Sequence, residues 1–208
     1  MAIKDVYQAV LDFEEDTIAG IVEKELAGGA DVNKVLQEGL IAAMDAVGKS
    51  FSEGELFVPE MLMAAQTMKA GLEVIKPKLG AGGSASAGVC VIGTVKGDLH
   101  DIGKNLVGMM LEGGGFEVFD LGVDVEPKAF VDAAKQHNAS IVGLSALLTT
   151  TMPAMEETVA ALKEAGLGNV KVMIGGAPVT QAYADKIGAS GYSEDAPSAV
   201  ELARKLSK

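Results

Sequence analysis

Apolar side chains recur at every third or fourth position through the first part of the chain, which predicts amphipathic helices. Asp31 is suited to cap the third of these helices, and Pro59 suits the first turn of the fourth. We therefore predict an up-down bundle of roughly four helices over residues 1–79. The stripes that define it are Val6, Val10, Phe13 and Thr17; Ile18, Ile21, Val22, Glu25 and Leu26; Val35, Leu36, Leu40, Met44 and Val47; and Met61, Leu62, Ala65, Met68, Leu72 and Ile75.

The pattern changes after a stretch of small residues, and strand-like runs then alternate with helix-like runs. Residues 80–88 are rich in Gly, Ala and Ser, so we expect a linker there. Continuous apolar strands that alternate with helices predict a parallel sheet with helices on both faces. The expected fold of residues 89–208 is a flavodoxin-like, Rossmann-type, doubly wound sheet of five strands. The predicted strands are residues 89–95, 116–121, 141–145, 170–174 and 191–192, and the predicted helices are residues 101–112, 127–137, 152–165, 179–187 and 197–206.

Composition and charge argue against several classes of function. The formal net charge is −12, which disfavours binding to nucleic acids or anionic membranes because their phosphates would be repelled. No apolar run reaches the roughly 20 residues of a transmembrane helix, and the first residues lack the apolar run of a signal peptide. The single cysteine, Cys90, lies in an apolar strand and suits the core of a protein in a reducing compartment. We expect a cytoplasmic protein that binds neither nucleic acid nor membrane.

Polar and small residues stand at the carboxyl ends of three predicted strands, where open α/β sheets bind ligands. The first strand is followed by Asp98-Leu99-His100-Asp101-Ile102-Gly103, the third ends in Ser145-Ala146-Leu147, and the fourth is followed by Gly175-Gly176. Each segment also has a plain structural interpretation as a capped helix start or a tight turn. Strands one and three flank the point where strand order reverses in a flavodoxin-like sheet, so we expect their loops to face one crevice.

Together, these segments resemble the signature of the cobalamin-binding domain found in methionine synthase, in base-off mutases and in corrinoid proteins of anaerobic methyltransferase systems. That signature is Asp-x-His-x-x-Gly, then Ser-x-Leu, then Gly-Gly, in this order and at these strand ends. The resemblance covers essentially the whole chain, because the family also carries a helical bundle before the sheet. It implies that the cofactor is cobalamin or a related corrinoid.

The resemblance also assigns roles to individual residues. It implies that His100 is the lower axial ligand of cobalt, and that Asp98 and Thr151 form a relay that orients the ring and governs its protonation. Ser145 and Leu147 would line the slot for the nucleotide tail. The full set of other residues that it places at the corrinoid on the sheet domain is Asp101, Ile102, Gly103, Ser145, Leu147, Thr149, Gly175 and Gly176.

Residues 51–61 resemble the helical cap over the upper cobalt face in the methyltransferase branch of the family. Carried over by position, Phe51, Val58 and Met61 would shield a methyl group, although these side chains also suit an ordinary bundle core. The implied function is that of a methyl carrier. It would accept a methyl group on Co(I) from a partner methyltransferase that uses a methylamine, methanol or methoxyarene donor. A second methyltransferase would pass the group to tetrahydrofolate or a thiol, and a reductive activase would be a further partner.

Three alternatives carry different sequence features. A subunit of an adenosylcobalamin-dependent mutase would share the histidine loop but would require a barrel over the upper cobalt face. A cobalamin sensor would need an output module such as a DNA-binding domain, and none is visible in the sequence. A flavodoxin or receiver domain would show a hydroxyl-rich phosphate loop or a cluster of acids with a lysine. The loop after the first strand holds Gly97-Asp98-Leu99-His100 instead, and no substrate domain is visible, so we expect a carrier subunit.

Overall fold

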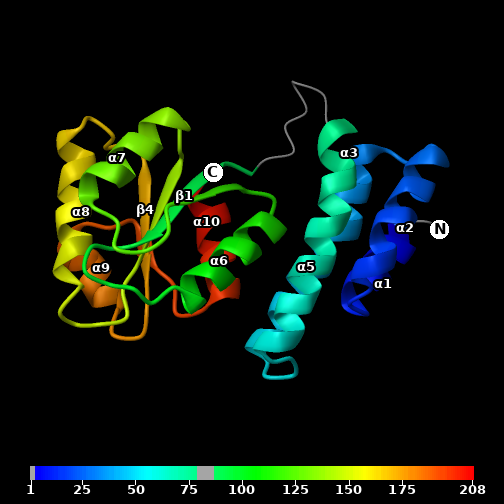
Figure 1. Cartoon of the computed structure of the whole chain (residues 1–208), viewed down its shortest axis with the longest axis horizontal. Helices are drawn as coiled ribbons and strands as arrows, with labels where there is room; N and C mark the ends of the chain where they lie inside the picture. Colours follow the sequence, from blue (N-terminus) through cyan, green and yellow to red (C-terminus); the bar gives the residue numbers. More distant parts are fainter. Residues whose placement is uncertain (1–2, 79–86) are drawn as a thin grey trace. The chain divides into compact units, whose positions relative to one another are not determined.

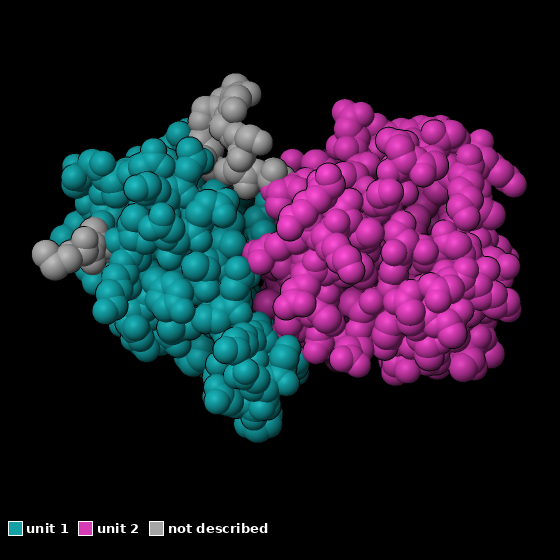
Figure 2. Space-filling view, turned by 180° about the vertical axis from the view of Figure 1, so that it is seen from behind, with its two compact units in different colours: residues 1–86, 112–115 teal, residues 87–111, 116–208 magenta. Residues whose placement is uncertain are grey.

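A computed structural model describes residues 3–78 and 87–208 of the 208-residue chain (Figure 1). The chain divides into two compact units, which Figure 2 colours separately. Unit 1 comprises residues 1–86 with residues 112–115, and unit 2 comprises residues 87–111 and 116–208. Most of the predicted linker, residues 80–88, lies outside the described residues, so the predicted domain limits stay predictions.

Unit 1 is helical, as its apolar period predicts. Helix α2 packs along α5, and α1 contacts both of them. Asp31 caps the third helical segment, where its carboxylate accepts a hydrogen bond from the Lys34 amide at 2.9 Å. Pro59 lies in the first turn of α5, as predicted. The elements are α1 (Ile3–Leu11), α2 (Glu15–Ala27), α3 (Val32–Lys34), the π-helix η1 (Val35–Ile41), α4 (Ala42–Ser52), α5 (Val58–Ile75) and the 3₁₀-helix η2 (Lys76–Lys78).

Two local features of unit 1 differ from the predicted pattern. The first predicted stripe continues through Phe13, but α1 ends at Leu11 and Phe13 adopts a positive φ of 60° in the turn before α2. The third helix contains a π-helical stretch at Val35–Ile41. The Ala42 amide donates to the carbonyl oxygen of Gln37, five residues earlier, which is the hydrogen-bond spacing of a π-helix.

Unit 2 is a doubly wound α/β domain. Its sheet has the strand order β2-β1-β3-β4-β5, and every strand pair is parallel. Helices α7, α8 and α9 cover one face of the sheet, and α6 and α10 cover the other (Figure 1). The elements are β1 (Val89–Thr94), α6 (Ile102–Gly113), β2 (Glu117–Asp120), α7 (Pro127–Gln136), β3 (Ile141–Ser145), α8 (Pro153–Glu164), β4 (Lys171–Gly175), α9 (Gln181–Ile187), β5 (Gly191–Tyr192) and α10 (Ala196–Leu206).

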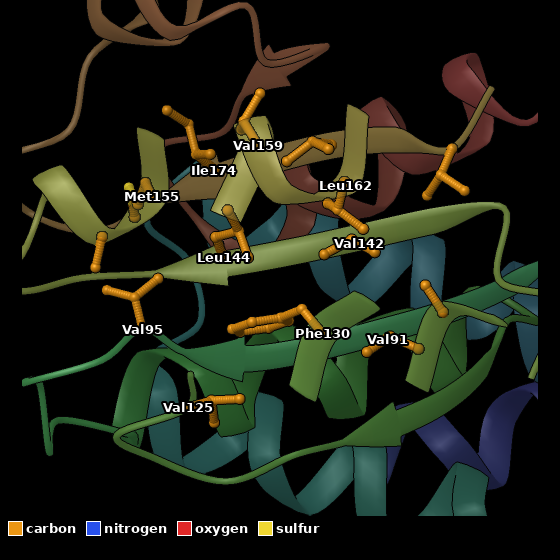
Figure 3. Close-up of a cluster of buried hydrophobic side chains, with 14 of the residues drawn as sticks. Val91, Val95, Val125, Phe130, Val142, Leu144, Met155, Val159, Leu162 and Ile174 are labelled. Carbon is orange, nitrogen blue, oxygen red and sulfur yellow. The ribbon is translucent and has the colours of Figure 1, made fainter. Parts of the chain in front are cut away.

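The main core of unit 2 lies between the sheet and helices α7 to α9 (Figure 3). Val91, Val142 and Ile174 contribute from the strands, and the fully buried Phe130 and Met155 contribute from the helices. Cys90 is buried in β1 as predicted, and burial raises the pKa of its thiol to about 12, so it stays protonated at neutral pH. This core fixes the strands whose carboxyl ends carry the motifs. No helix within the described ranges 3–78 and 87–208 has the length and apolar character needed to cross a membrane.

Candidate functional site

The three predicted motif segments meet at one edge of the sheet. β1 and β4 both pair with β3, and the register aligns Thr94 with Ser145 and Ser145 with Gly175. The strand order reverses between β1 and β3, because β2 lies on one side of β1 and the later strands follow on the other. This is the switch point where open α/β sheets bind ligands. The predicted proximity of the first and third loops is therefore confirmed.

The Asp98 carboxylate forms more hydrogen bonds than any other described side chain at this edge of the sheet. It is fully buried, and both carboxylate oxygens accept hydrogen bonds. Oδ1 accepts from the His100 backbone amide at 3.1 Å and lies 2.8 Å from His100 Nδ1. Oδ2 accepts from the Leu147 amide at 2.8 Å, the Leu148 amide at 3.3 Å and the Thr151 hydroxyl at 2.7 Å. Asp98 thus ties the histidine loop to the loop that follows β3.

These contacts determine the charge of Asp98. Burial alone would raise the pKa of the carboxyl group, but hydrogen bonds from the Thr151 hydroxyl, the His100 ring and amide, and the Leu147 amide outweigh it. They hold the pKa of Asp98 well below its usual range. Asp98 is therefore a carboxylate at neutral pH.

The charge of Asp98 in turn fixes the tautomer of His100. A carboxylate has no proton to donate, so the hydrogen bond between Asp98 Oδ1 and His100 Nδ1 requires the proton on Nδ1. Nε2 of the neutral ring then carries the lone pair, and no hydrogen bond engages it within residues 3–78 and 87–208. The side chain is 53 % exposed. This arrangement, in which a carboxylate partner fixes the ring, is the one found for histidines that bind metals.

Thr151 extends the pair to a third side chain, as the sequence predicts. It is buried, and its hydroxyl lies 2.7 Å from Asp98 Oδ2 and 2.9 Å from the carbonyl oxygen of Leu148. A hydroxyl has a single proton, so Thr151 can donate to only one of these acceptors at a time. None of the three threonines caps α8, whose first residue follows Met152 without a side-chain capping bond. Thr149 is exposed in the same loop.

Gly175 ends β4, and Gly176 follows it where two backbones approach closely. Gly176 has a φ of 130°, and a Cβ at this position would lie 1.9 Å from the carbonyl oxygen of Ala146. Any other residue would therefore collide with the loop after β3. Gly175 and Ser145 end their strands side by side, and Gly175 accepts a hydrogen bond from the Ala146 amide through its carbonyl oxygen at 3.3 Å.

The remaining predicted residues of the histidine loop begin α6. The Asp101 carboxylate accepts a hydrogen bond from the Asn105 side chain at 3.1 Å, and its carbonyl accepts from the Asn105 amide. Ile102 is 82 % exposed. A Cβ on Gly103 would meet no described protein atom within 4 Å, so packing within the chain does not require glycine there.

Several large apolar side chains are exposed in the two loops joined by Asp98. Besides Ile102, they are Leu99 in the histidine loop and Leu147 and Leu148 after β3. Exposed apolar residues that gather on one surface typically mark a binding site. Leu99 and Leu148 were not predicted as site residues, and their only sequence signal is that they are apolar residues next to the motif.

Phe51, Val58 and Met61 all belong to unit 1. Met61 is fully buried, Phe51 is half-buried, and Val58 is 39 % exposed. The neighbouring Phe57, which begins α5 as its cap residue, is 67 % exposed. A shielding role for the three predicted residues stays a prediction.

Sequence reasoning missed three charged residues around the histidine loop: Lys104, Asp120 and Asp124. Lys104 is buried and forms an ion pair with Asp120 at the end of β2. Asp124 accepts a hydrogen bond from the Gly97 amide at 2.7 Å. The sequence offered a signal for Lys104 alone, because a lysine in the first turn of a helix is unfavourable with respect to the helix dipole and so suggests a specific partner.

The side chains at this edge fit a corrinoid. The lone pair on His100 Nε2 is available to a metal, because Asp98 occupies the other ring nitrogen. The apolar residues Leu99, Ile102 and Leu147 suit a large macrocycle, and the bare backbone at Gly103 leaves space that a side chain would fill. The donor set, a neutral imidazole with a carboxylate partner, suits cobalt as it suits other transition metals.

Comparison with known proteins supports the same assignment. A B12 binding domain family matches residues 88–201, and a second family, also described as a B12 binding domain, matches residues 2–76. Dimethylamine corrinoid protein 1 of Methanosarcina acetivorans is 48 % identical over 206 residues, which cover 98 % of this chain and 96 % of that protein. A corrinoid protein of Desulfitobacterium hafniense is 42 % identical over 208 residues, with 98 % and 96 % covered.

Solved structures agree with the sequence matches. A chain of the methanol:cobalamin methyltransferase complex MtaBC from Methanosarcina barkeri superposes with a TM-score of 0.89 at 30 % identity, covering 99 % of this chain and 79 % of that one. A cobalamin-binding protein from Desulfitobacterium hafniense superposes with a TM-score of 0.81 at 37 % identity, covering 98 % of both chains. The predicted family and fold are therefore confirmed. The chain belongs to the B12-binding family of corrinoid proteins, and its cofactor is cobalamin or a related corrinoid.

Proposed function

We propose that this chain is a methyl carrier, in which the His100 ring would bind the cobalt of a corrinoid. The observation that carries the proposal is the His100–Asp98 pair, with Nδ1 bound to a buried carboxylate and Nε2 available. The likeness to dimethylamine and methanol corrinoid proteins supports a place in a methyltransferase system. When bound, cobalt supplies a centre that can accept a methyl group in its reduced state and release it to a nucleophile.

The chain's own residues would control the ligand side of this chemistry. Asp98 keeps the proton on Nδ1 and so keeps the Nε2 lone pair directed away from the carboxylate. Thr151 and the Leu147 amide hold Asp98 as an anion. A proton taken up by the pair would occupy Nε2, where it competes with the metal. The proton content of the His–Asp pair is thus coupled to whether the histidine ligates.

We infer that the methyl donor is a methylated amine. The support is the 48 % identity to a dimethylamine corrinoid protein and the 47 % identity to a trimethylamine corrinoid protein. The proposed partners are a methyltransferase for the amine, a second methyltransferase that transfers the group to tetrahydrofolate or a thiol, and a reductive activase. We also propose that Phe51, Val58 and Met61 of unit 1 would shield the methyl group.

The first test is anaerobic reconstitution with hydroxocobalamin followed by gel filtration. We expect the wild-type protein to retain corrinoid in a one-to-one ratio and to show the spectrum of a form ligated by histidine. His100→Ala should retain less corrinoid and lose that spectrum, whereas His137→Gln serves as the matched control for the other histidine. Loss of corrinoid from the wild-type protein on the column would contradict the carrier assignment.

The second test addresses the donor. The reconstituted protein is reduced to Co(I) and mixed with methyltransferases for dimethylamine, trimethylamine or methanol, each with its substrate. We expect the Co(I) absorbance to disappear with an amine methyltransferase and to persist with the methanol enzyme. Consumption only with methanol would overturn the inferred donor but not the carrier function. Persistence with all three, despite tight corrinoid binding, would favour a mutase subunit or sensor.

A further inference from the structure

The histidine loop is held at both of its ends by one short segment at the end of the neighbouring strand β2 and in the turn after it. The loop occupies residues 95–101 between β1 and α6. The segment that holds it is residues 120–124, at the end of β2 and just beyond it, which we call the β2 clamp. Gly122 in the clamp accepts a hydrogen bond from the Thr94 amide at 2.9 Å, which fixes the clamp to the last residue of β1.

Asp124 holds the beginning of the loop through two hydrogen bonds. Its carboxylate oxygen Oδ1 accepts from the Gly97 amide at 2.7 Å. Its own amide donates to the carbonyl oxygen of Asp98 at 3.0 Å. Gly97 and Asp124 both adopt positive φ, 82° and 54°, so two tight turns face each other here. Asp124 therefore fixes the backbone of Asp98, and the Asp98 carboxylate in turn orients the His100 ring.

Lys104 holds the end of the loop. Its ammonium group forms an ion pair with Asp120 and donates to the Asn105 side chain at 2.6 Å. The Asp120 carboxylate also accepts from the Gly122 amide at 2.9 Å. This pair joins the first turn of α6 to the end of β2.

The burial of the pair is unequal, which bears on its role. The Lys104 side chain is 4 % exposed, whereas that of Asp120 is 40 % exposed. Burying an ammonium group costs several kcal/mol, and an apolar residue of similar size is often as stable or more so. Lys104 also lies in the first turn of α6, where the helix dipole disfavours a cation. Stability alone therefore gives little reason for a lysine at this position.

We propose that Lys104, Asp120 and Asp124 are positioning residues that hold the histidine loop in the shape needed for axial ligation. The proposal rests on the proposed function, because it concerns the ligation of cobalt by His100. With both ends fixed, the His100 ring keeps its place when a corrinoid binds. With one end released, the ring spends more time away from the metal, and ligation weakens while the fold remains intact.

The first variant replaces the buried cation by an apolar side chain of similar length, Lys104→Met. We expect its melting temperature to stay close to that of the wild type, because Asp120 can be solvated in its half-exposed position. Corrinoid affinity should fall by about tenfold, the lower end of the range for outer residues that support a metal ligand. The matched control is Lys128→Met, which removes an exposed Lys128–Asp132 ion pair from α7 in the same unit. The control should change neither quantity.

Two further variants, both at Asp124, distinguish the effect of its hydrogen bond from the effect of its charge. Asp124→Asn keeps an oxygen acceptor for the Gly97 amide and tolerates a positive φ, whereas Asp124→Ala does neither. We expect Asn to retain near wild-type affinity and Ala to lose about tenfold. In the apo protein, amide hydrogen exchange at Gly97 should accelerate in the Ala variant and stay slow in the Asn variant.

Axial nitrogen splitting in the electron paramagnetic resonance spectrum of the Co(II) form is the direct readout. The wild-type spectrum tests the proposed function, and the variants test the clamp. If the wild type shows histidine ligation and the Met and Ala variants show the same fraction ligated, the clamp is contradicted. Equal losses in Asp124→Asn and Asp124→Ala would also contradict it, because charge and not geometry would then matter. If Asp124→Ala does not fold, Lys104→Met still decides the question.

Discussion

His100 and His137 are the two histidines of the chain, and both follow a regular element of unit 2. His100 lies in the loop after β1, where Asp98 binds Nδ1 and the ring is half-exposed. His137 ends α7, and its backbone amide donates to Ala133 while its ring stacks on Phe119 with centroids 3.6 Å apart. The two rings therefore differ in their partners: His100 has a buried carboxylate on Nδ1, which is the arrangement typical of metal-binding histidines, and His137 has an aromatic ring.

Among the substitutions that test the difference between the two histidines, replacing His100 should have the largest effect on corrinoid ligation. His100→Ala removes the only proposed protein ligand, so we expect no axial nitrogen from histidine and a shifted absorption spectrum after reconstitution. The measurement is the spectrum of the gel-filtered protein beside that of His137→Gln. A spectrum identical to that of the wild type would mean that His100 does not ligate.

Asp98→Asn should nearly abolish ligation while leaving His100 in place. We expect the carboxamide introduced by this substitution to present its oxygen to the three donors at Oδ2, from Leu147, Leu148 and Thr151. Its NH₂ group then faces His100, at the cost of the hydrogen bond from the His100 amide. The ring would then accept at Nδ1 and carry its proton on Nε2, where it blocks the metal. We expect corrinoid affinity to fall about 10- to 100-fold. Retained histidine ligation in this variant would contradict the tautomer assignment.

The same variant has a defined pH dependence in the apo protein. The pKa of Asp98 is lowered in the folded state, so its stabilising effect is present above the unfolded pKa of about 3.9 and is lost as the pH falls further. Wild-type protein should therefore melt at a higher temperature than Asp98→Asn at pH 7. The difference should narrow as the pH falls below about 4. A constant difference between melting curves over this range would show that Asp98 does not act through its charge.

Thr151 should have an intermediate effect. Thr151→Val keeps the shape but removes the hydroxyl that donates to Asp98, and a hydrogen bond to a charged group is worth about 1.5–3 kcal/mol. We expect the free energy of unfolding of the Val variant to fall by an amount in this range. Thr151→Ser retains the donor and should lose less than the Val variant. Equal losses in urea denaturation would assign the effect to packing.

His137→Gln should have the smallest effect. It removes the stacking on Phe119, and aromatic pairs contribute about 0.5–1.5 kcal/mol. We expect a slightly lower melting temperature and unchanged corrinoid binding. Weaker corrinoid binding by this variant would contradict the claim that, of the two histidines, His100 alone binds the corrinoid.

Local patterns predicted the parts of this molecule that depend on neighbouring residues. The apolar runs identified the first four strands, the short strand at Gly191–Tyr192 was also predicted, and the spacing of Asp98, His100 and Gly103 located the loop at the switch point. The register that brings Thr94 beside Ser145 follows from the parallel topology. Helix ends shifted by one or two residues, because hydrogen bonding and not periodicity sets them.

Other features depend on contacts between distant residues, which no local pattern reports. The Gly97–Asp124 bond spans 27 positions, and the Lys104–Asp120 pair spans 16. The positive φ at Phe13 and the π-helix at Val35–Ile41 were not predicted either, since neither has a signal in the apolar period. The number of donors around Asp98 was also unpredictable, because the Leu147 and Leu148 amides are backbone groups of an irregular loop.

The most direct test of the account uses the His137→Gln protein, in which His100 is the one remaining histidine of the sequence. It is produced without a tag from histidine labelled with heavy nitrogen, reconstituted and reduced to Co(II). The account predicts that the label changes the axial nitrogen splitting in the electron paramagnetic resonance spectrum. A splitting that the label leaves unchanged would assign the axial nitrogen to the corrinoid's own base. That result would contradict ligation by His100.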